Sequence, residues 1–303
     1  QGGQATQSDM YEGFDAGQAT AYDGFEERGP REFDDFAAGS GEQYEFGEAR
    51  QFDQSEADRY MSPYIHHSGG TVCEPVDIPV SKRHLDMVYA HLKYSDKAFM
   101  GSVTASERAA DSIELARIGF GGDLADRTVM SSLINASSPL VWDDTMLAAA
   151  ETYAAANQAC IISPFILSVA MAPTTAAAVA AQTLAEALAG MAFCQLVRPG
   201  APVIFGSFAS SMSMATGAPT FGTPEPAIGS LVVGQLARRV GLPLRCAGAF
   251  TSSKVPDGQA MAESTMSMMS AILCASSPGI EAKKGCSRFD DSLPSCVTAL
   301  TSS

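Results

Sequence analysis

TVMSSLIN, residues 128–135, is the first of four short segments rich in β-forming residues that alternate with long Ala-rich segments of helical composition. The other three are ACIISPF (159–165), VIFGSF (203–208) and LRCAGAF (244–250). Each ends in small or polar residues before a helix-start signal, a pattern typical of a parallel β/α protein with its chemistry at the strand ends. Upstream, KAFMGSVT (97–104) predicts another strand and 63–68 a weaker first one, so we expect six βα units.

Helices are predicted after each of these strands. The strand starts at 97, 128, 159, 203 and 244 are 31, 31, 44 and 41 residues apart, which fits successive βα units with crossover helices. One helix has especially clear ends: Thr223 as N-cap and Pro224 at the first helical position, with Gly241 as the C-terminal glycine. The predicted helices are 81–94, 106–120, 143–157, 174–197, 224–240 and 257–274.

Composition and charge exclude several classes of protein. The chain has 303 residues, 46% of them hydrophobic, enough for one barrel-sized domain or two smaller ones. Its net charge is −15, of which residues 1–60 carry −11. The sequence has no basic stripe that could neutralise phosphates, which argues against binding to nucleic acid.

The seven cysteines show no CxxC and no Cys/His spacing for zinc. We therefore expect no metal site, and we expect reduced thiols in the cytoplasm. From Gln1 onward there is no basic region followed by an apolar one, and no signal peptide is expected.

Three segments differ in composition. Residues 1–60 are acidic and rich in Gly, with aromatic residues recurring every 11 positions, as at Tyr11, Tyr22 and Phe33. Such a low-complexity segment is expected to be a disordered tail, with an aromatic interaction segment as the alternative. Residues 61–273 form the predicted β/α part. Residues 274–303 have no helical or strand period where a seventh strand should follow, so we expect truncation or a frame change there, with a divergent folded end as the alternative.

The Ala-rich segment 174–197 resembles a membrane span in composition. Gln182, Glu186 and Gln195 interrupt it, and we interpret it as a helix packed on a sheet, with no membrane contact.

Six residues in the strand-end loops are candidates for substrate binding: Trp142, Asp143, Phe208, Phe221, Glu225 and Lys254. Each has a structural alternative. Asp143 lies where a helix N-cap belongs and Glu225 in a first helical turn. The aromatic residues could close the rim of the fold, and Lys254 could be a solvated loop residue, or otherwise a Schiff-base or anion-binding lysine.

Loops that follow parallel strands converge on one face, where these residues would bring aromatic rings and carboxylates together. Aromatic faces attract a cation and carboxylates balance its charge, so the mixture is suited to a quaternary ammonium group. The sequence contains neither a P-loop nor a GxGxxG motif after a strand, so a phosphate site is poorly supported. The four histidines all precede the second strand, and His84 and His91 are expected to pack rather than to bind ligands.

The same loops carry a resemblance to a known family. Five segments in order are similar to the trimethylamine methyltransferase superfamily over roughly residues 65–272: NASSPLVWDDTML (135–147), SPFILSVAMAPTT (163–175), AEALAGMAFCQLVRPGAPVIFGSF (185–208), GAPTFGTPE (217–225) and GQLARRVGLPLRCAGAFTSSKVPDGQA (234–260). The resemblance implies a TIM-type (β/α)8 barrel with about six βα units present. It also implies transfer of a methyl group from a methylated amine to the Co(I) of a cobalamin (corrinoid) carried by a partner protein.

The sequence contains no pyrrolysine, so the resemblance points to the branch that acts on quaternary amines such as glycine betaine. Trp142, Phe208 and Phe221 would then supply aromatic faces, Asp143 and Glu225 negative charge, and Lys254 a partner for a substrate carboxylate. The alternatives are an inactive remnant that at most binds a small cation and a Schiff-base lyase using Lys254. Because the sequence pattern lacks two βα units of such a barrel, we expect no methyl transfer by this chain itself. A homo-oligomer is left open.

Overall fold

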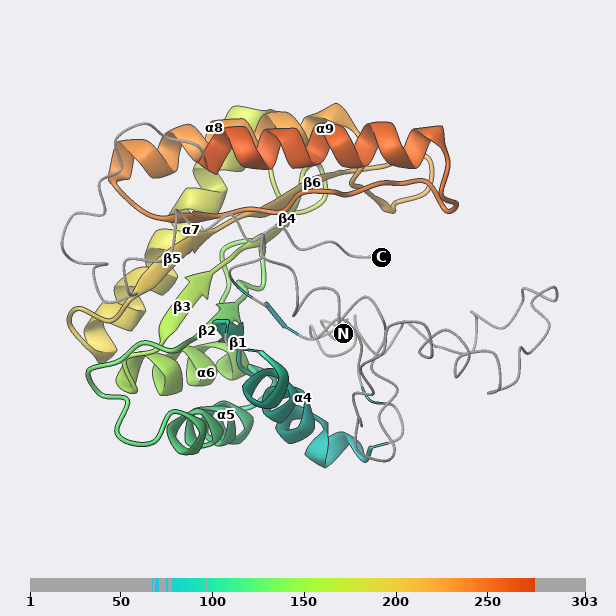
Figure 1. Cartoon of the computed structure of the whole chain (residues 1–303). Helices are drawn as coiled ribbons and strands as arrows, with labels where there is room; N and C mark the ends of the chain where they lie inside the picture. The colour runs from blue at the N-terminus through green and yellow to red at the C-terminus, as the bar shows by residue number, and fades with distance from the viewer. Residues whose placement is uncertain (1–66, 68, 71–74, 76–77, 96, 276–303) are drawn as a thin grey trace, which may run out of the picture. The chain divides into compact units, whose positions relative to one another are not determined.

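The computed structural model describes residues 67, 69–70, 75, 78–95 and 97–275 (Figure 1). All of them belong to one compact unit, Phe52–Ser303. The tail predicted at 1–60 and all but the first two residues of the segment 274–303 lie outside the described residues. Disorder in the N-terminal segment and the three-segment organisation therefore stay predictions.

The main sheet has five parallel strands that follow one another in chain order. They are β1 (Phe99–Met100), β2 (Met130–Ile134), β3 (Ala159–Ile162), β5 (Val203–Gly206) and β8 (Leu244–Arg245). An isolated parallel bridge joins His67 to Ala98, so the end of the weak first strand also lies beside its neighbour. The strands predicted from 97, 128, 159, 203 and 244 and their parallel order are confirmed.

Helices connect these strands and pack against their neighbours along the chain. They are α4 (Val80–Tyr94), α5 (Ser106–Gly119), α6 (Asp144–Ala155), α7 (Ala176–Val197), α8 (Pro224–Val240) and α9 (Gly258–Ala275). All six predicted helices are confirmed, with ends that agree within two residues. Figure 1 shows them in chain order around the outer side of the sheet, from α4 to α9.

Strand alternation divides the sheet into two faces. Met130, Ile134 and Ile162 pack with buried Ala residues of the helices in one large cluster. The opposite face has a small cluster made of strand residues alone, Met100, Leu133, Ala159, Ile161 and Ile204. Helices that cover only one face of a parallel sheet in chain order are the arrangement of a β/α barrel rather than of a doubly wound sheet. The described chain is an α/β protein with the sheet of a half barrel.

Helix α7 is the segment with membrane-like composition, and it is long and apolar enough to cross a bilayer by those criteria alone. In the structure it packs against β3 and β5 and against α6 and α8. Val179, Ala187, Met191 and Cys194 are buried there. The prediction of a helix packed on the sheet is confirmed.

Two strands continue beyond the main sheet. After Pro164, β4 (Phe165–Leu167) extends the line of β3, and after Ser207, β6 (Phe208–Met212) extends β5. These two extensions pair in parallel, and β7 (Pro219–Thr220) adds an antiparallel edge to β6. The sequence pattern predicts no strand between 208 and the helix at 224, which is wrong for these short strands because their pairing depends on neighbours distant in sequence.

The ends of α8 agree with the prediction except at its cap. Pro224 opens the helix and Gly241 follows it in the left-handed conformation with φ 71°. Thr223 occupies the N-cap position but makes no side-chain capping bond. Its hydroxyl lies 3.4 Å from the Thr220 carbonyl and 3.4 Å from Ser211 Oγ.

Candidate functional site

The carboxyl ends of the parallel strands carry a cluster of four phenylalanines, Phe165, Phe208, Phe221 and Phe250. Phe165 and Phe208 are register partners on β4 and β6, and their rings stack with centroids 5.2 Å apart. Phe221 follows β7 and Phe250 follows β8. Their centroids lie 5.4 and 5.6 Å from that of Phe208 and 5.3 Å from each other. All four side chains are half-buried, so part of the aromatic surface stays open to a ligand.

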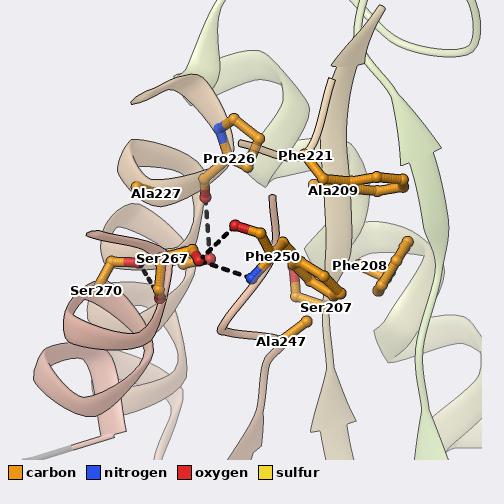
Figure 2. Close-up of a pocket in the computed structure, with 11 residues that line it drawn as sticks. Ser207, Phe208, Ala209, Phe221, Pro226, Ala227, Ala247, Phe250, Ser267 and Ser270 are labelled. Atoms are coloured by element: carbon orange, nitrogen blue, oxygen red, sulfur yellow. Dashed lines mark hydrogen bonds between the residues drawn. The ribbon is translucent and has the colours of Figure 1, made fainter. Parts of the chain in front are cut away.

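Figure 2 shows a hollow beside this cluster, between β6, α8 and α9. It occupies about 320 Å³, open solvent at its mouth included. Phe208, Phe221 and Phe250 form one wall, and small residues such as Ala227 and Ser270 form the rest. The Phe250 amide donates a hydrogen bond to Ser267 Oγ of α9 at 2.8 Å, which fixes the loop after β8.

A carboxylate on α9, Glu263, joins two of the loops around the cluster. It accepts hydrogen bonds from the Ser252 amide at 2.7 Å and from Thr251 Oγ1 at 2.8 Å. Gly222, beside Phe221, lies so close that an added Cβ would collide with the Glu263 carboxylate. The hydrogen bond from the Ser252 amide lowers the pKa of Glu263 below its ordinary value, and hydrogen bonds from Gln259 and Thr251 lower it further. A negative charge therefore lies near the aromatic rings at neutral pH.

The structure brings together two of the six predicted site residues, Phe208 and Phe221. Asp143 is the N-cap of α6: its carboxylate accepts from the Met146 amide at 2.8 Å and from Ser137 Oγ at 2.7 Å. Glu225 is exposed in the first turn of α8, and Lys254 is exposed in the loop after β8. Their contribution to substrate binding stays a prediction.

Trp142 packs in the layer between sheet and helices. A Cβ added to Gly190 of α7 would lie 2.6 Å from Trp142 Cζ2 and 2.8 Å from Ile162 Cγ2. The indole ring therefore needs a glycine opposite it, and it is not among the residues that line the described hollow. Its role as an aromatic wall of the site stays a prediction, which these contacts do not support.

The histidines within the described residues lie on the amino-terminal part of the sheet and on α4. His84 makes a 2.8 Å contact with Asp111, and His91 stacks on Phe99 with centroids 5.3 Å apart. The expectation that these two residues pack is confirmed. Among the described residues, no group of three or more His, Cys, Asp or Glu side chains could hold a metal ion.

Comparison with known proteins identifies the family. The model of the trimethylamine methyltransferase (MTTB) family matches residues 36–282. The chain belongs to this family. Within the MTTB family, the chain is 44% identical over 214 residues to glycine betaine methyltransferase of Desulfitobacterium hafniense (strain Y51), covering 70% of this chain and 45% of that protein.

Two further relatives differ in how much they match. Proline betaine:corrinoid methyltransferase of Eubacterium limosum is 31% identical over 199 residues, 63% of this chain and 41% of that protein. Trimethylamine methyltransferase MttB of Methanosarcina barkeri is 38% identical over 108 residues, 34% of this chain and 22% of that protein. The chain thus spans less than half the length of these MTTB relatives. The family match begins at residue 36, inside the segment that we assigned to the acidic tail.

A second carboxylate that the sequence did not indicate organises the loop after β2. Glu186 of α7 is 2% exposed and accepts hydrogen bonds from Ser138 Oγ at 2.5 Å and the Leu140 amide at 2.9 Å. The sequence pattern indicates Glu186 only as a polar interruption of an apolar helix. Neither Glu186 nor Glu263 lies in a motif from which its contacts could be inferred, because both reach loops far away in the sequence.

Proposed function

We propose that the described unit holds the amine site of a methyltransferase that moves a methyl group from a quaternary amine, such as glycine betaine, to a corrinoid protein. The observation that carries the proposal is the cluster of four phenylalanines at the strand ends. Phenylalanine faces attract a quaternary ammonium group, whose methyl groups also pack well against aromatic carbon. The Glu263 carboxylate adds a negative charge near these rings.

The proposal includes a complete (β/α)8 barrel as the architecture of the site. Five parallel strands in chain order, with helices on one face, support this geometry. The sites of such barrels lie at the carboxyl ends of the strands, where the phenylalanines are found.

The reaction would require little acid–base chemistry from this chain. Co(I) of the corrinoid would supply the electron pair that forms a new bond to the methyl carbon. The carbon–nitrogen pair would stay on nitrogen, so a quaternary amine leaves as a neutral tertiary amine and needs no proton. The phenylalanines would hold the ammonium group so that one methyl group faces out of the strand ends, which is catalysis by orientation.

The corrinoid protein would dock on the loops at that end. Four of them carry a large apolar residue that is well exposed: Leu140 at 70%, Val169 at 44%, Met214 at 78% and Val255 at 59%. Exposed apolar residues gathered on one side of a protein are typical of an interaction surface. We also propose that the protein acts in the cytoplasm, where its thiols would stay reduced.

Calorimetry with tetramethylammonium and glycine betaine tests the amine site. Phe208→Leu keeps an apolar side chain but removes the ring, so both ligands should bind more weakly by roughly 0.5–2 kcal/mol. Phe120→Leu, at the end of α5, serves as the matched control and should leave both affinities unchanged. Equal affinities in folded Phe208→Leu and wild type would contradict the aromatic site.

Formation of methylcobalamin from glycine betaine and Co(I) cobalamin tests the reaction. Product formation would support methyl transfer and would contradict our expectation from the sequence that this chain does not turn over. Amine binding without methyl transfer, even with a corrinoid protein present, would favour the cation-binding alternative.

A further inference from the structure

One row of residues crosses the inner face of the sheet, the face that none of the described helices covers. Ile162 of β3 pairs with Phe205 of β5, so Ser163 stands beside Gly206 in the next position, and Gly206 pairs with Arg245 of β8. Leu244 and Cys246 both belong to the helix-side core, so strand alternation places Arg245 on the inner face. Below this row lies the apolar layer of Leu133, Ile161 and Ile204.

Arg245 is a buried cation with no counter-ion among the described residues. It is 2% exposed, its Nε has no hydrogen-bond partner, and within the described part of the chain its guanidinium makes no ion pair. Burial lowers the pKa of Arg245 to about 10, which still leaves it protonated at neutral pH. A buried charge is unfavourable unless something pairs with it, so this site is suited to an anion.

Ser163 is a second buried polar group. It is fully buried, and its hydroxyl makes no hydrogen bond within the part of the chain that the structure describes. A Cβ at Gly206 would lie 2.5 Å from Ser163 Cβ. Because glycine has no side chain, Ser163 can lie over Gly206, which separates it from Arg245 in the row. On the other side, Ile134 pairs with Ile162, which places half-buried Asn135 next to Ser163 in the same row.

Above this row, the same strands carry the aromatic cluster. Phe165 lies two residues beyond Ser163 and Phe208 two residues beyond Gly206, and the two phenylalanines are register partners. Two residues of a strand span about 7 Å. A carboxylate and an ammonium group joined by a short carbon chain can bridge this distance, with contacts at both ends.

We propose that Arg245, Ser163 and Asn135 bind the carboxylate of the substrate, so that this site selects a zwitterionic betaine over amines without a carboxylate. The inference rests on the proposed function, because the ammonium group is assigned to Phe165 and Phe208. Guanidinium, hydroxyl and amide groups all donate hydrogen bonds to a carboxylate, and arginine does so with two parallel bonds. In this proposal, buried Arg245 takes the role that the sequence suggested for exposed Lys254, because no described residue forms an ion pair with Arg245.

Calorimetry of the full chain with three probes separates the two ends of the ligand. Glycine betaine has both charges, choline has the ammonium group alone, and 3,3-dimethylbutanoate has the carboxylate with a neutral tert-butyl group of the same shape. Arg245→Met should weaken glycine betaine and 3,3-dimethylbutanoate by about tenfold or more, the loss expected for a charged hydrogen bond, and should leave choline nearly unchanged. Ser163→Ala should weaken the same two probes by a few fold.

The melting temperature distinguishes a binding role of Arg245 and Ser163 from a structural one, because loss of a structural residue would lower it. Removing an unpaired buried charge or hydroxyl leaves no partner behind, so the melting temperatures of both variants should equal or exceed that of wild type without ligand. Arg239→Gln, at an exposed site on α8, controls for the change in net charge and should alter no affinity. If Arg245→Met does not fold, Ser163→Ala decides the test.

The outcomes distinguish this inference from the proposed function. Betaine binding that depends on Phe208 but not on Arg245 or Ser163 overturns the carboxylate site and leaves the amine site intact. Binding of 3,3-dimethylbutanoate that depends on Arg245, without binding of choline or betaine, supports the anion site and contradicts the proposed function. Absence of binding by all three probes overturns both.

Discussion

The indole ring of Trp142 lies directly against Gly190 of α7, where a Cβ atom would come within 2.6 Å of ring atom Cζ2. Gly190→Ala should therefore overpack the layer between sheet and helices and lower the free energy of unfolding by about 1–3 kcal/mol. Gly229→Ala in α8 is the matched control, because nothing lies within 4 Å of its added Cβ. That change should stabilise by roughly 0.5–1 kcal/mol through helix propensity, and urea denaturation measures both.

Trp142→Ala separates packing from binding. If the ring acts in packing, the variant should lose up to about 3 kcal/mol of stability and the folded protein should keep its affinity for glycine betaine. A role in the site would instead weaken binding by roughly 1–2 kcal/mol. Calorimetry at a temperature where the variant stays folded, together with urea denaturation, measures both quantities.

The sequence predicts most of the fold because hydrophobic period and helix-end signals are local. All helices and the main strands could be located in this way, and Phe208 and Phe221 could be placed at the strand ends. The sequence could not place Phe165 and Phe250 in the cluster, because their contacts depend on the pairing of β4 with β6 and on the path after β8.

Side-chain directions and tertiary contacts that no local pattern encodes explain what could not be predicted. Trp142 precedes an N-cap, and neither strand nor helix period indicates which way its ring turns. Arg245 lies inside a predicted strand, but its unpaired burial could be seen only once its neighbours were known. Glu263 and Glu186 bind loops through contacts between residues 11 and 48 positions apart.

Glu263 should make stability depend on pH. Its folded-state pKa lies below the ordinary value of 4.5, so its stabilising effect is present above that value and is lost as pH falls through the folded pKa. Glu263→Gln should therefore melt below wild type at pH 7, and the difference should vanish in acid. Melting curves from pH 7 downward check this, and a difference that stays constant with pH would contradict it.

The four cysteines described by the structure, Cys160, Cys194, Cys246 and Cys274, should resist thiol reagents while the protein is folded. All are buried, and the sulfur atoms of Cys246 and Cys274 lie 3.1 Å apart. The contact with Cys274 and burial raise the pKa of Cys246, which suppresses its reactive thiolate. The same contact lowers the pKa of Cys274, so burial is what protects that thiol. Labelling with iodoacetamide followed by peptide mapping should show modification of these residues only in denaturant. Fast labelling of any of them in the native protein would contradict their burial.

Glu186 should hold the loop after β2 in place. Glu186→Ala removes the acceptor of the Leu140 amide and the Ser138 hydroxyl from a buried position, so it should lower the free energy of unfolding by roughly 2–3 kcal/mol. Glu186→Gln keeps an acceptor oxygen and should lose about half as much. Glu151→Ala, at an exposed position of α6, is the control and should change stability by less than about 0.5 kcal/mol. Hydrogen exchange locates the effect: the Leu140 amide should be protected in wild type and exchange faster in Glu186→Ala, whereas unchanged protection would show that the loop is held by other contacts.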